Sequence, residues 1–370
     1  MRVEAIDLYH LAMPLVAPFV TSFGREDVHD CILVRVSGEG SSGWGEAPVM
    51  RAPLYNEETI ETAWHMLRDL LIPAALGRDY AHPAEVGGWW AAVRRNYMAK
   101  AGVEMACWDL WANSEGLSLA EALGGEKERI PAGVSVGLQA SDHDLVALVR
   151  RHLAEGYRRI KVKIKPGRDL RLLEALRDSL GGFPLMADAN SAYRLSDAPH
   201  LQELDRFALM MLEQPLDHDD LVDHAALQAL LTTPICLDES ILSAEDARRA
   251  LQLGSCRVVN IKAPRVGGLG AARRLQETCA AQGVPVWCGG LLETGIGRAH
   301  NLALASLAGF TLPGDTSPSS RYFSEDIIEP PVTMSADGYI AVPRGPGLGH
   351  TVVMEQVRRW TLRAESFSDR

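Results

Sequence analysis

Charged residues recur at a regular spacing through the middle of this 370-residue chain. The set is Lys161, Lys163, Asp188, Glu213, Asp238 and Lys262. From Lys163 the next three steps are 25 residues each, and the last step is 24. Carboxylates offer only oxygen, which suits Mg²⁺ or Mn²⁺ better than zinc. One divalent ion held by Asp188, Glu213 and Asp238 could bind a substrate carboxylate and stabilise the enediolate that forms when a neighbouring C–H loses its proton.

The lysines are candidates for moving that proton. Lys163 can act as a base only if its pKa falls from about 10.4 toward roughly 7 to 8. Lys161 lies two residues earlier in the run R-I-K-V-K-I-K-P and would share one strand face with Lys163. Its charge and that of a metal ion would both lower the pKa of Lys163. Lys262 could protonate the opposite face of the carbon or stabilise the anion as a cation, and two opposed lysines would permit racemisation.

Short apolar runs end at these charges and predict the strands of a (β/α) barrel. Helical patterns separate runs at residues 159–164, 185–187, 208–212, 235–237 and 258–261. A strand, a helix and two turns need about 25 residues, so the spacing predicts consecutive βαβ units. Further runs at 131–137, 284–288 and 310–313 bring the count to eight strands. Active sites of such barrels lie at the C-terminal ends of the strands, where these charges and Ser135 of the first strand would converge.

Two simpler interpretations compete with an active site. The two lysines of the K-x-K motif could be solvated on an exposed edge strand. The charges at the strand ends could also form a ring of ion pairs that only solvates the barrel rim. Five charges in register on successive strands favour the active site over both.

The segments outside the barrel predict a second domain of α+β type. Strands are expected at 3–11 and 31–36, and helical patterns dominate residues 57–113. Apolar loops at 17–24 and 50–55 are either packed loops or a lid over a substrate. The predicted fold is therefore α/β, a (β/α) barrel with an α+β capping domain. We expect three segments, which are the N-terminal cap at 1–128, the barrel at 129–322, and a C-terminal segment at 323–370 that returns to the cap.

Composition restricts the partners and the compartment. The net charge of −11 and the pI near 5.5 argue against nucleic acid or an anionic membrane surface as the main partner. No segment is long and apolar enough to span a membrane, and the N-terminus lacks the pattern of a signal peptide. The six cysteines contain no C-x-x-C pair. We expect reduced thiols in a cytoplasmic protein.

The order K-x-K, Asp, Glu, Asp, Lys on successive strands resembles the muconate lactonizing enzyme subgroup of the enolase superfamily. The mandelate racemase subgroup has a His-Asp dyad in place of the last lysine, and no histidine occurs near Lys262. The run W-C-G-G-L-L-E-T-G-I-G-R-A-H-N at 287–301 and the run P-G-D-T at 313–316 are similar to the o-succinylbenzoate synthase and N-succinylamino acid racemase family. The resemblance covers nearly the whole chain.

The resemblance implies a role for each matching residue. Asp188, Glu213 and Asp238 would hold one Mg²⁺ or Mn²⁺, Lys163 and Lys262 would be the acid/base pair, and Lys161 would tune them. Asn190 and Glu239 would lie beside the metal ligands. Substrate contacts are implied for Ser135, Gly289, Gly290, Leu291, Leu292, Phe19, Phe23, Met50 and Arg265. An arginine at position 265 goes with racemase activity in similar family members, the alternative being a surface ion pair. The implied protein is a homo-oligomer acting on a small carboxylate, either an N-succinylamino acid or the o-succinylbenzoate precursor of the menaquinone pathway.

Other activities remain as alternatives. Dipeptide epimerases of this superfamily carry an Asp-x-Asp pair in the region that here reads G-G-L-L-E at 289–293. Muconate cycloisomerisation is a further alternative. Lys163 or Lys262 could instead form a Schiff base in an aldolase barrel, which would leave the three carboxylates without a role. A metal-binding or scaffold protein without turnover is the last alternative.

Overall fold

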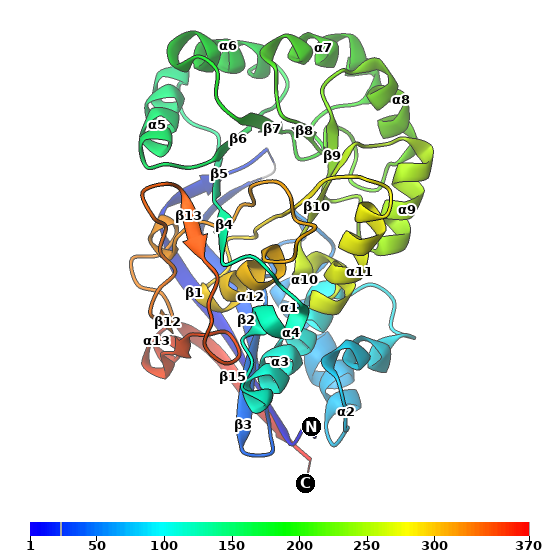
Figure 1. Cartoon of the computed structure of the whole chain (residues 1–370), viewed down its shortest axis with the longest axis vertical. Coiled ribbons are helices and arrows are strands. Elements are labelled where there is room, and N and C mark those ends of the chain that lie inside the picture. Colours follow the sequence, from blue (N-terminus) through cyan, green and yellow to red (C-terminus); the bar gives the residue numbers. More distant parts are fainter. Residues whose placement is uncertain (23, 370) are drawn as a thin grey trace.

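The computed structural model describes residues 1–22 and 24–369. It has two parts (Figure 1). Strands and helices in green and yellow form a barrel, and the blue N-terminal strands, the cyan helices and the red C-terminal segment lie against it. The two ends of the chain lie close together on the far side from the green helices. None of the described helices combines the length and apolar character needed to cross a bilayer.

A parallel sheet of seven strands in chain order forms the barrel wall. The strands are β5 (Gly133–Val136), β6 (Arg159–Lys163), β7 (Leu185–Asp188), β8 (Leu212–Glu213), β9 (Ile235–Leu237), β10 (Val258–Ile261) and β11 (Val286–Cys288). The main helices outside them are α5 (Asp142–Ala154), α6 (Asp169–Leu180), α7 (Ala198–Gln202), α8 (Val222–Leu230), α9 (Ala244–Leu253), α11 (Leu269–Ala280) and α12 (Gly295–Ala305). Shorter helical turns are η3 (Leu195–Asp197), η4 (Glu203–Phe207), α10 (Ala263–Val266) and η5 (Ser319–Arg321). The predicted (β/α) barrel with a cap is confirmed.

Two predicted strands differ from the structure. The strand expected at 208–212 begins only at Leu212, because Ala208 ends η4 with a left-handed backbone (φ 47°). The strand expected at 310–313 does not form as a regular strand. Phe310 makes one bridge to Val286, and the N–H groups of residues 311 and 312 donate to the same Val286 carbonyl. Pro313 has no N–H to continue a ladder, so an irregular segment closes the ring between β11 and β5.

The cap contains an antiparallel sheet in the order β15-β1-β2-β3. Its strands are β1 (Ala5–Val20), β2 (Arg25–Gly38), β3 (Ser41–Ala47) and the C-terminal β15 (Thr361–Ser368). The helical elements of this part are α1 (Ile60–Met66), η1 (Leu67–Leu71), α2 (Ile72–Ala75), η2 (Pro83–Trp90), α3 (Tyr97–Glu115), α4 (Leu119–Leu123) and α13 (Met354–Trp360). Two small sheets pair β12 (Ile328–Glu329) with β14 (Thr351–Val352), and β4 (Arg129–Pro131) with β13 (Tyr339–Ala341).

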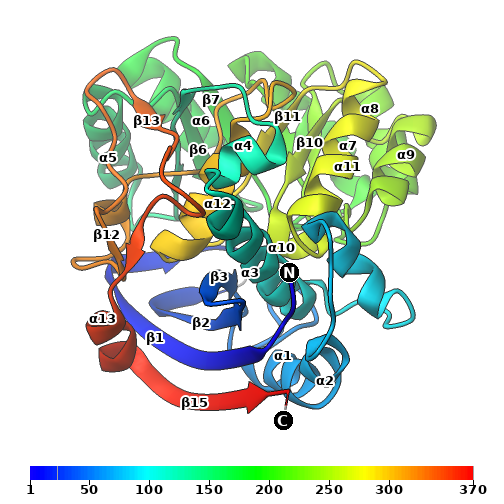
Figure 2. The same cartoon turned by 60° about the horizontal axis from the view of Figure 1, so that its bottom comes forward.

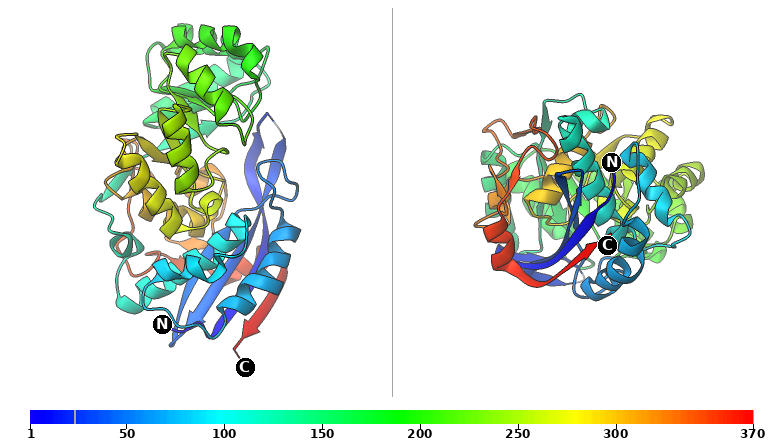
Figure 3. Two further views of the ribbon diagram at one scale, coloured as in Figure 1. Left: turned by 90° about the vertical axis from the view of Figure 1, so that its right-hand side faces the viewer. Right: turned by 90° about the horizontal axis from the view of Figure 1, so that it is seen from below.

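The apolar loop predicted at 17–24 is mostly strand, because β1 continues to Val20 and β2 starts at Arg25. The resulting hairpin reaches from the cap toward the barrel (Figure 3, left). Its end is held there, since the N–H of Leu138 after β5 donates to the carbonyl of Val20 at 2.9 Å. The hairpin therefore covers the C-terminal side of the barrel strands.

Helix α3 lies between the cap sheet and the barrel helices (Figure 2). Its backbone approaches β3 so closely that a Cβ on Gly45 would lie 2.1 Å from the carbonyl oxygen of Gly102. From α3, the buried carboxylate of Glu104 accepts hydrogen bonds from the N–H groups of Leu269 and Gly270 at the start of α11. Such carboxylates satisfy the free N–H groups of a helix start. This contact fixes the cap on the barrel and thereby positions the hairpin.

Candidate active site

A cavity at the C-terminal ends of the barrel strands collects most of the predicted residues. Its barrel side is lined by Lys161, Lys163 and Lys262, with Ser135, Asn190 and Asp315. The cap contributes Phe19, Met50 and Tyr55, and the segment after β11 contributes Gly290, Leu291 and Leu292. The lining thus combines lysines with apolar side chains, and the cap also adds the polar residues Glu26, His29 and Asp30. The strand register places Lys161 and Lys163 on one face of β6, and both side chains reach this cavity.

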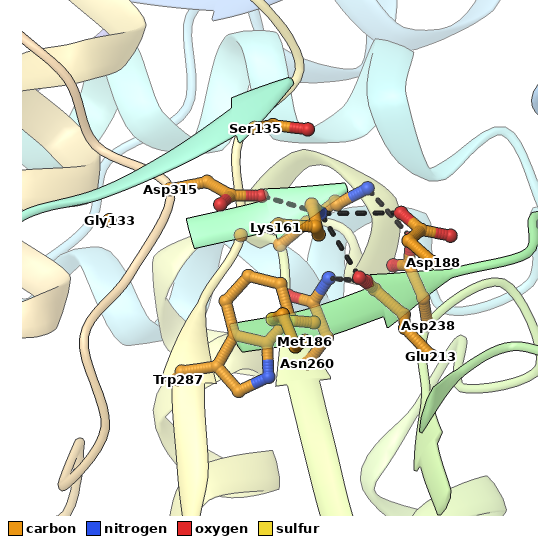
Figure 4. Close-up of polar contacts among 12 residues, drawn as sticks. Gly133, Ser135, Lys161, Met186, Asp188, Glu213, Asp238, Asn260, Trp287 and Asp315 are labelled. Atoms are coloured by element: carbon orange, nitrogen blue, oxygen red, sulfur yellow. Dashed lines mark hydrogen bonds and ion pairs between the residues drawn. The ribbon is translucent and has the colours of Figure 1, made fainter. Parts of the chain in front are cut away.

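Three carboxylates lie beneath these lysines, on three neighbouring strands. Asp188 ends β7, Glu213 ends β8, and Asp238 follows β9 directly. Each is at most 1% exposed. The strand register pairs Asp188 with Glu213, so the side chains rise at the same level of the barrel (Figure 4). The predicted spacing of 25 residues therefore corresponds to one step around the barrel wall.

Ammonium groups neutralise all three carboxylates. Lys163 Nζ lies 2.6 Å from Asp188 Oδ2, and Lys262 Nζ lies 2.8 Å from Asp238 Oδ2. Lys161 Nζ donates to Glu213 Oε2 at 3.0 Å. In the described part of the chain these three carboxylates do not form a group whose ligand atoms all lie within 4.8 Å of one another. The oxygen-only donor set still fits a hard divalent ion, which would replace the ammonium groups as the partner of the carboxylates.

The ion pairs also decide the direction of the lysine pKa shifts. Burial disfavours the Lys161 ammonium, but the charges of Asp315, Glu213 and Asp188 outweigh burial and raise the pKa of Lys161. Burial likewise opposes the charge on Lys262, and the neighbouring Tyr55 and Glu213 raise its pKa above the ordinary value. A divalent ion on the carboxylates would offset their negative charge. Its own positive charge would lower the pKa of both lysines.

His29, Cys31 and Glu46 do form a compact group of possible metal ligands. The oxygens of Glu46 are already used, because they accept from His29, from the N–H and hydroxyl of Thr294, and from the N–H of Gly297. Burial raises the pKa of the Cys31 thiol, which keeps it protonated. This group is a link between β3 and the start of α12 rather than a metal site.

The remaining predicted residues differ in how they relate to the cavity. Ser135, Phe19, Met50, Gly290, Leu291 and Leu292 line the cavity. Asn190 accepts from Lys163 Nζ at 2.6 Å and donates to Glu239 Oε1 at 2.9 Å, so Glu239 acts on the cavity through Asn190. Gly289 does not line the cavity. A Cβ there would lie 2.2 Å from Asn260 Oδ1 and 2.8 Å from Lys262 Cε, so the missing side chain makes room for both residues. Phe23 lies outside the described residues.

Arg265 is behind the cavity rather than in its lining. Its guanidinium is 1% exposed and bonds to the carboxylate of Asp238. It also donates to the carbonyl of Asn260 at 2.6 Å and to that of Ile241 at 2.9 Å. A surface ion pair is therefore the wrong description. In this structure Arg265 reaches the cavity through Asp238 and through the hydroxyl of Tyr55, to which its Nη1 donates at 3.3 Å.

Two cavity residues that were not among the predicted site residues, Tyr55 and Asp315, contact its charged groups. Tyr55, from the loop before α1, donates to Asp238 Oδ1 at 3.1 Å and lies 3.0 Å from Lys262 Nζ. No spacing pattern connects this cap residue to the barrel. Asp315 contacts Lys161 at 2.6 Å. Its signal was present, because Asp315 ends the eighth apolar run as the other charged residues end theirs.

Comparisons with known proteins agree with this geometry. The mandelate racemase / muconate lactonizing enzyme N-terminal domain matches residues 5–124, and the enolase C-terminal domain-like family matches residues 144–357. The chain belongs to the enolase superfamily. Within the superfamily, it is 54% identical to an o-succinylbenzoate synthase of Geobacillus kaustophilus, over 99% of this chain and 98% of that protein. It is 48% identical to an N-succinylamino acid racemase of Thermus thermophilus, over 98% of each chain.

A solved structure of an enolase superfamily member from Listeria innocua has the same fold. The TM-score is 0.96 at 42% sequence identity, over 100% of this chain and 99% of that chain. The resemblance to the muconate lactonizing enzyme subgroup, and within it to the o-succinylbenzoate synthase and N-succinylamino acid racemase family, is confirmed. Membership of the superfamily implies a divalent metal ion.

Proposed function

We propose that this chain removes a proton next to a substrate carboxylate, as an o-succinylbenzoate synthase that also racemises N-succinylamino acids. One observation carries the proposal. Lys163 on β6 and Lys262 after β10 line one cavity, and the three carboxylates of Asp188, Glu213 and Asp238 lie at or directly after the ends of the strands between them. Strands on different sides of a barrel point their end residues at a common centre. A substrate carbon held there has one lysine on each side.

Asp188, Glu213 and Asp238 would hold one Mg²⁺ or Mn²⁺. When bound, the ion supplies positive charge to the substrate carboxylate and to the enediolate. Lys163 takes the proton, and Asn190 orients it by accepting a hydrogen bond from its Nζ. In racemisation Lys262 returns a proton to the opposite face. In dehydration Lys262 stays charged and stabilises the anion, and Lys163 passes the proton it has taken to the departing hydroxyl, which leaves as water.

The unpaired polar groups of the cavity support a substrate with further oxygen atoms. Ser135 Oγ is buried and has no hydrogen-bond partner. A buried hydroxyl without a partner is costly, and a substrate carboxylate or acyl oxygen would satisfy it. Phe19, Met50 and Leu292 give the cavity an apolar wall. We propose that this wall receives the side chain of the amino acid or the ring of the succinylbenzoate precursor.

Further features belong to the same proposal. We divide the chain into a cap at 1–128, a barrel at 129–322 and a returning segment at 323–370. The free and buried state of all six cysteines supports a cytoplasmic protein.

We propose a homo-oligomer, which sedimentation at several protein concentrations would test. We propose that neither nucleic acid nor a membrane is a partner of this protein.

A substrate panel in D₂O tests the function. It contains both enantiomers of several N-succinylamino acids, the o-succinylbenzoate precursor, an L-Ala-D/L-Glu dipeptide and muconate. We expect α-proton exchange and racemisation with the N-succinylamino acids, and dehydration of the precursor. Exchange with the dipeptide alone would support an epimerase, and borohydride trapping of a lysine would support an aldolase. The variant Lys165→Ala is the control and should keep the wild-type activities, because Lys165 is exposed and lies just beyond β6.

A further inference from the structure

The ammonium group of Lys161 lies among three carboxylates. Its Nζ is 2.6 Å from Asp315 Oδ2, 3.0 Å from Glu213 Oε2 and 3.3 Å from Asp188 Oδ2. Figure 4 shows Asp315 on one side of this group and Asp188 and Glu213 on the other. Asp188 and Glu213 are two of the three proposed metal ligands. Lys161 and a divalent ion would therefore compete for the same oxygens.

Asp315 is held firmly in place on the other side. Its N–H donates to the carbonyl of Cys288 at 2.9 Å, within the segment that closes the barrel. Its second oxygen, Oδ1, lies 2.9 Å from Arg159 Nη2, an ion pair that lacks hydrogen-bond geometry. The Arg159 guanidinium is 1% exposed, and its centre lies 4.7 Å from the ring of Trp287. The carboxylate is thus anchored independently of the metal ligands.

We propose that Asp315 is a positioning residue that retains the Lys161 ammonium group when Asp188 and Glu213 take up a divalent ion. This inference rests on the proposed metal site. The Lys161 side chain is 4% exposed, so water at the cavity can compensate its charge only weakly when it loses two carboxylate partners. A buried charge without a partner is strongly unfavourable. With Asp315 present, the ammonium keeps one close partner and stays beside the substrate cavity. Without Asp315, metal binding would leave it unpaired.

The affinity for Mg²⁺, measured by titration calorimetry, tests this role. We expect Asp315→Asn to weaken Mg²⁺ binding about tenfold, the loss of roughly one hydrogen bond between charged groups. Removing any negative charge near a cation also weakens binding, so the same substitution is made in the Lys161→Met protein. There the ammonium is absent, and Asp315→Asn should change the affinity by less than about twofold. An equal loss in both backgrounds would overturn the inference.

A crystal structure of the wild-type protein with Mg²⁺ provides a test without variants. We expect Lys161 Nζ to remain at hydrogen-bond distance from Asp315 while it leaves Glu213 and Asp188. The opposite movement, away from Asp315, overturns the role of Asp315 even if Asp315→Asn fails to fold. Absence of Mg²⁺ binding to the wild type overturns the proposed metal site itself, and with it the inference. The two failures are therefore distinguishable.

Discussion

The hydroxyl of Tyr55 lies 3.0 Å from the ammonium nitrogen of Lys262, although 207 residues separate them in the sequence. The centre of the Tyr55 ring is 4.5 Å from the same nitrogen. A residue of the cap thus holds one of the two proposed acid/base groups of the barrel. The site is complete only when the loop before α1 is in place.

We predict that Tyr55→Phe slows proton exchange through Lys262 about tenfold, because the hydroxyl that bonds to Lys262, Asp238 and Arg265 is lost while the ring remains. Exchange through Lys163 should change less. Deuterium incorporation into each enantiomer distinguishes the two faces. Tyr80→Phe is the matched control, since its buried hydroxyl donates to the carbonyl of Cys107 and Tyr80 does not line the cavity. Equal slowing on both faces would contradict a specific role of Tyr55.

Substitution of each lysine tests the two-base arrangement. Lys163→Ala and Lys262→Ala should each abolish racemisation, because racemisation needs a base on both sides of one carbon. Each variant should still exchange the α-proton of the enantiomer that faces its remaining lysine. The measurement is mass spectrometry of each enantiomer after incubation in D₂O. A single variant that exchanges both enantiomers at the wild-type rate would refute the arrangement.

The barrel and its charged residues could be predicted because they depend on local pattern. Asp188, Glu213 and Asp238 each end a short apolar run, and strand alternation alone puts Lys161 and Lys163 on one face. The hairpin of β1 and β2 was missed because its apolar stretch, with Pro18 and Gly24, is also typical of a loop. Its strands are fixed by pairing with each other.

The contacts that orient the charged groups could not be predicted. Tyr55 and Arg265 both bond to Asp238, over sequence separations of 183 and 27 residues. No periodicity in the sequence predicts either contact. The Asp315–Arg159 pair depends on how the irregular eighth segment closes the barrel. Such contacts are set by tertiary packing, which a single sequence does not specify residue by residue.

Removal of the metal is the next prediction. Dialysis against EDTA should abolish turnover, and Mg²⁺ or Mn²⁺ should restore it. Asp238→Asn should weaken metal binding, and the fold should survive. Asp238 also pairs with Lys262 and Arg265, so its loss should lower the free energy of unfolding by about 3 kcal/mol. Calorimetric metal titration and urea unfolding measure the two effects. A variant with unchanged metal affinity and rate would show that Asp238 is no ligand.

The stability of the fold should depend on pH through Glu104. Burial raises the pKa of Glu104 to about 7, although the N–H groups of Leu269 and Gly270 donate to it. Between the ordinary pKa near 4.5 and this value, the native state holds a proton that the unfolded state has lost. The contribution of Glu104 to the free energy of unfolding is therefore largest below pH 4.5, and it is lost as the pH rises through 7.

We expect Glu104 to lower the free energy of unfolding by roughly 3 kcal/mol between pH 4.5 and pH 8. Urea unfolding at pH 5, 6, 7 and 8 measures this change. Burial also raises the pKa of Glu58 and of Asp109 to about 7, so the wild type contains further contributions of the same sign. The difference between wild type and Glu104→Gln isolates Glu104. Parallel curves for the two proteins would contradict the prediction.

Arg265 should affect the racemisation rate more than the dehydration rate. Its guanidinium bonds to the Asp238 carboxylate that also accepts from Lys262. Without Arg265, Asp238 would keep Lys262 as its only charged hydrogen-bond partner among these residues, beside the neutral Tyr55 hydroxyl, and would hold the proton of Lys262 more tightly. Racemisation requires Lys262 to accept and donate a proton, whereas dehydration requires only its charge.

Arg265→Gln should therefore lower kcat/KM for racemisation about tenfold more than kcat/KM for dehydration, the effect of a shift of one unit in the pKa of Lys262. Both activities are measured on the same preparation, with both enantiomers of one N-succinylamino acid and with the o-succinylbenzoate precursor. Arg257→Gln is the control, because Arg257 is exposed and its side chain donates to the carbonyl of Thr232, away from the cavity. If the substitution at 265 lowers both rates equally, or if the wild type dehydrates without racemising, Arg265 does not act through Lys262.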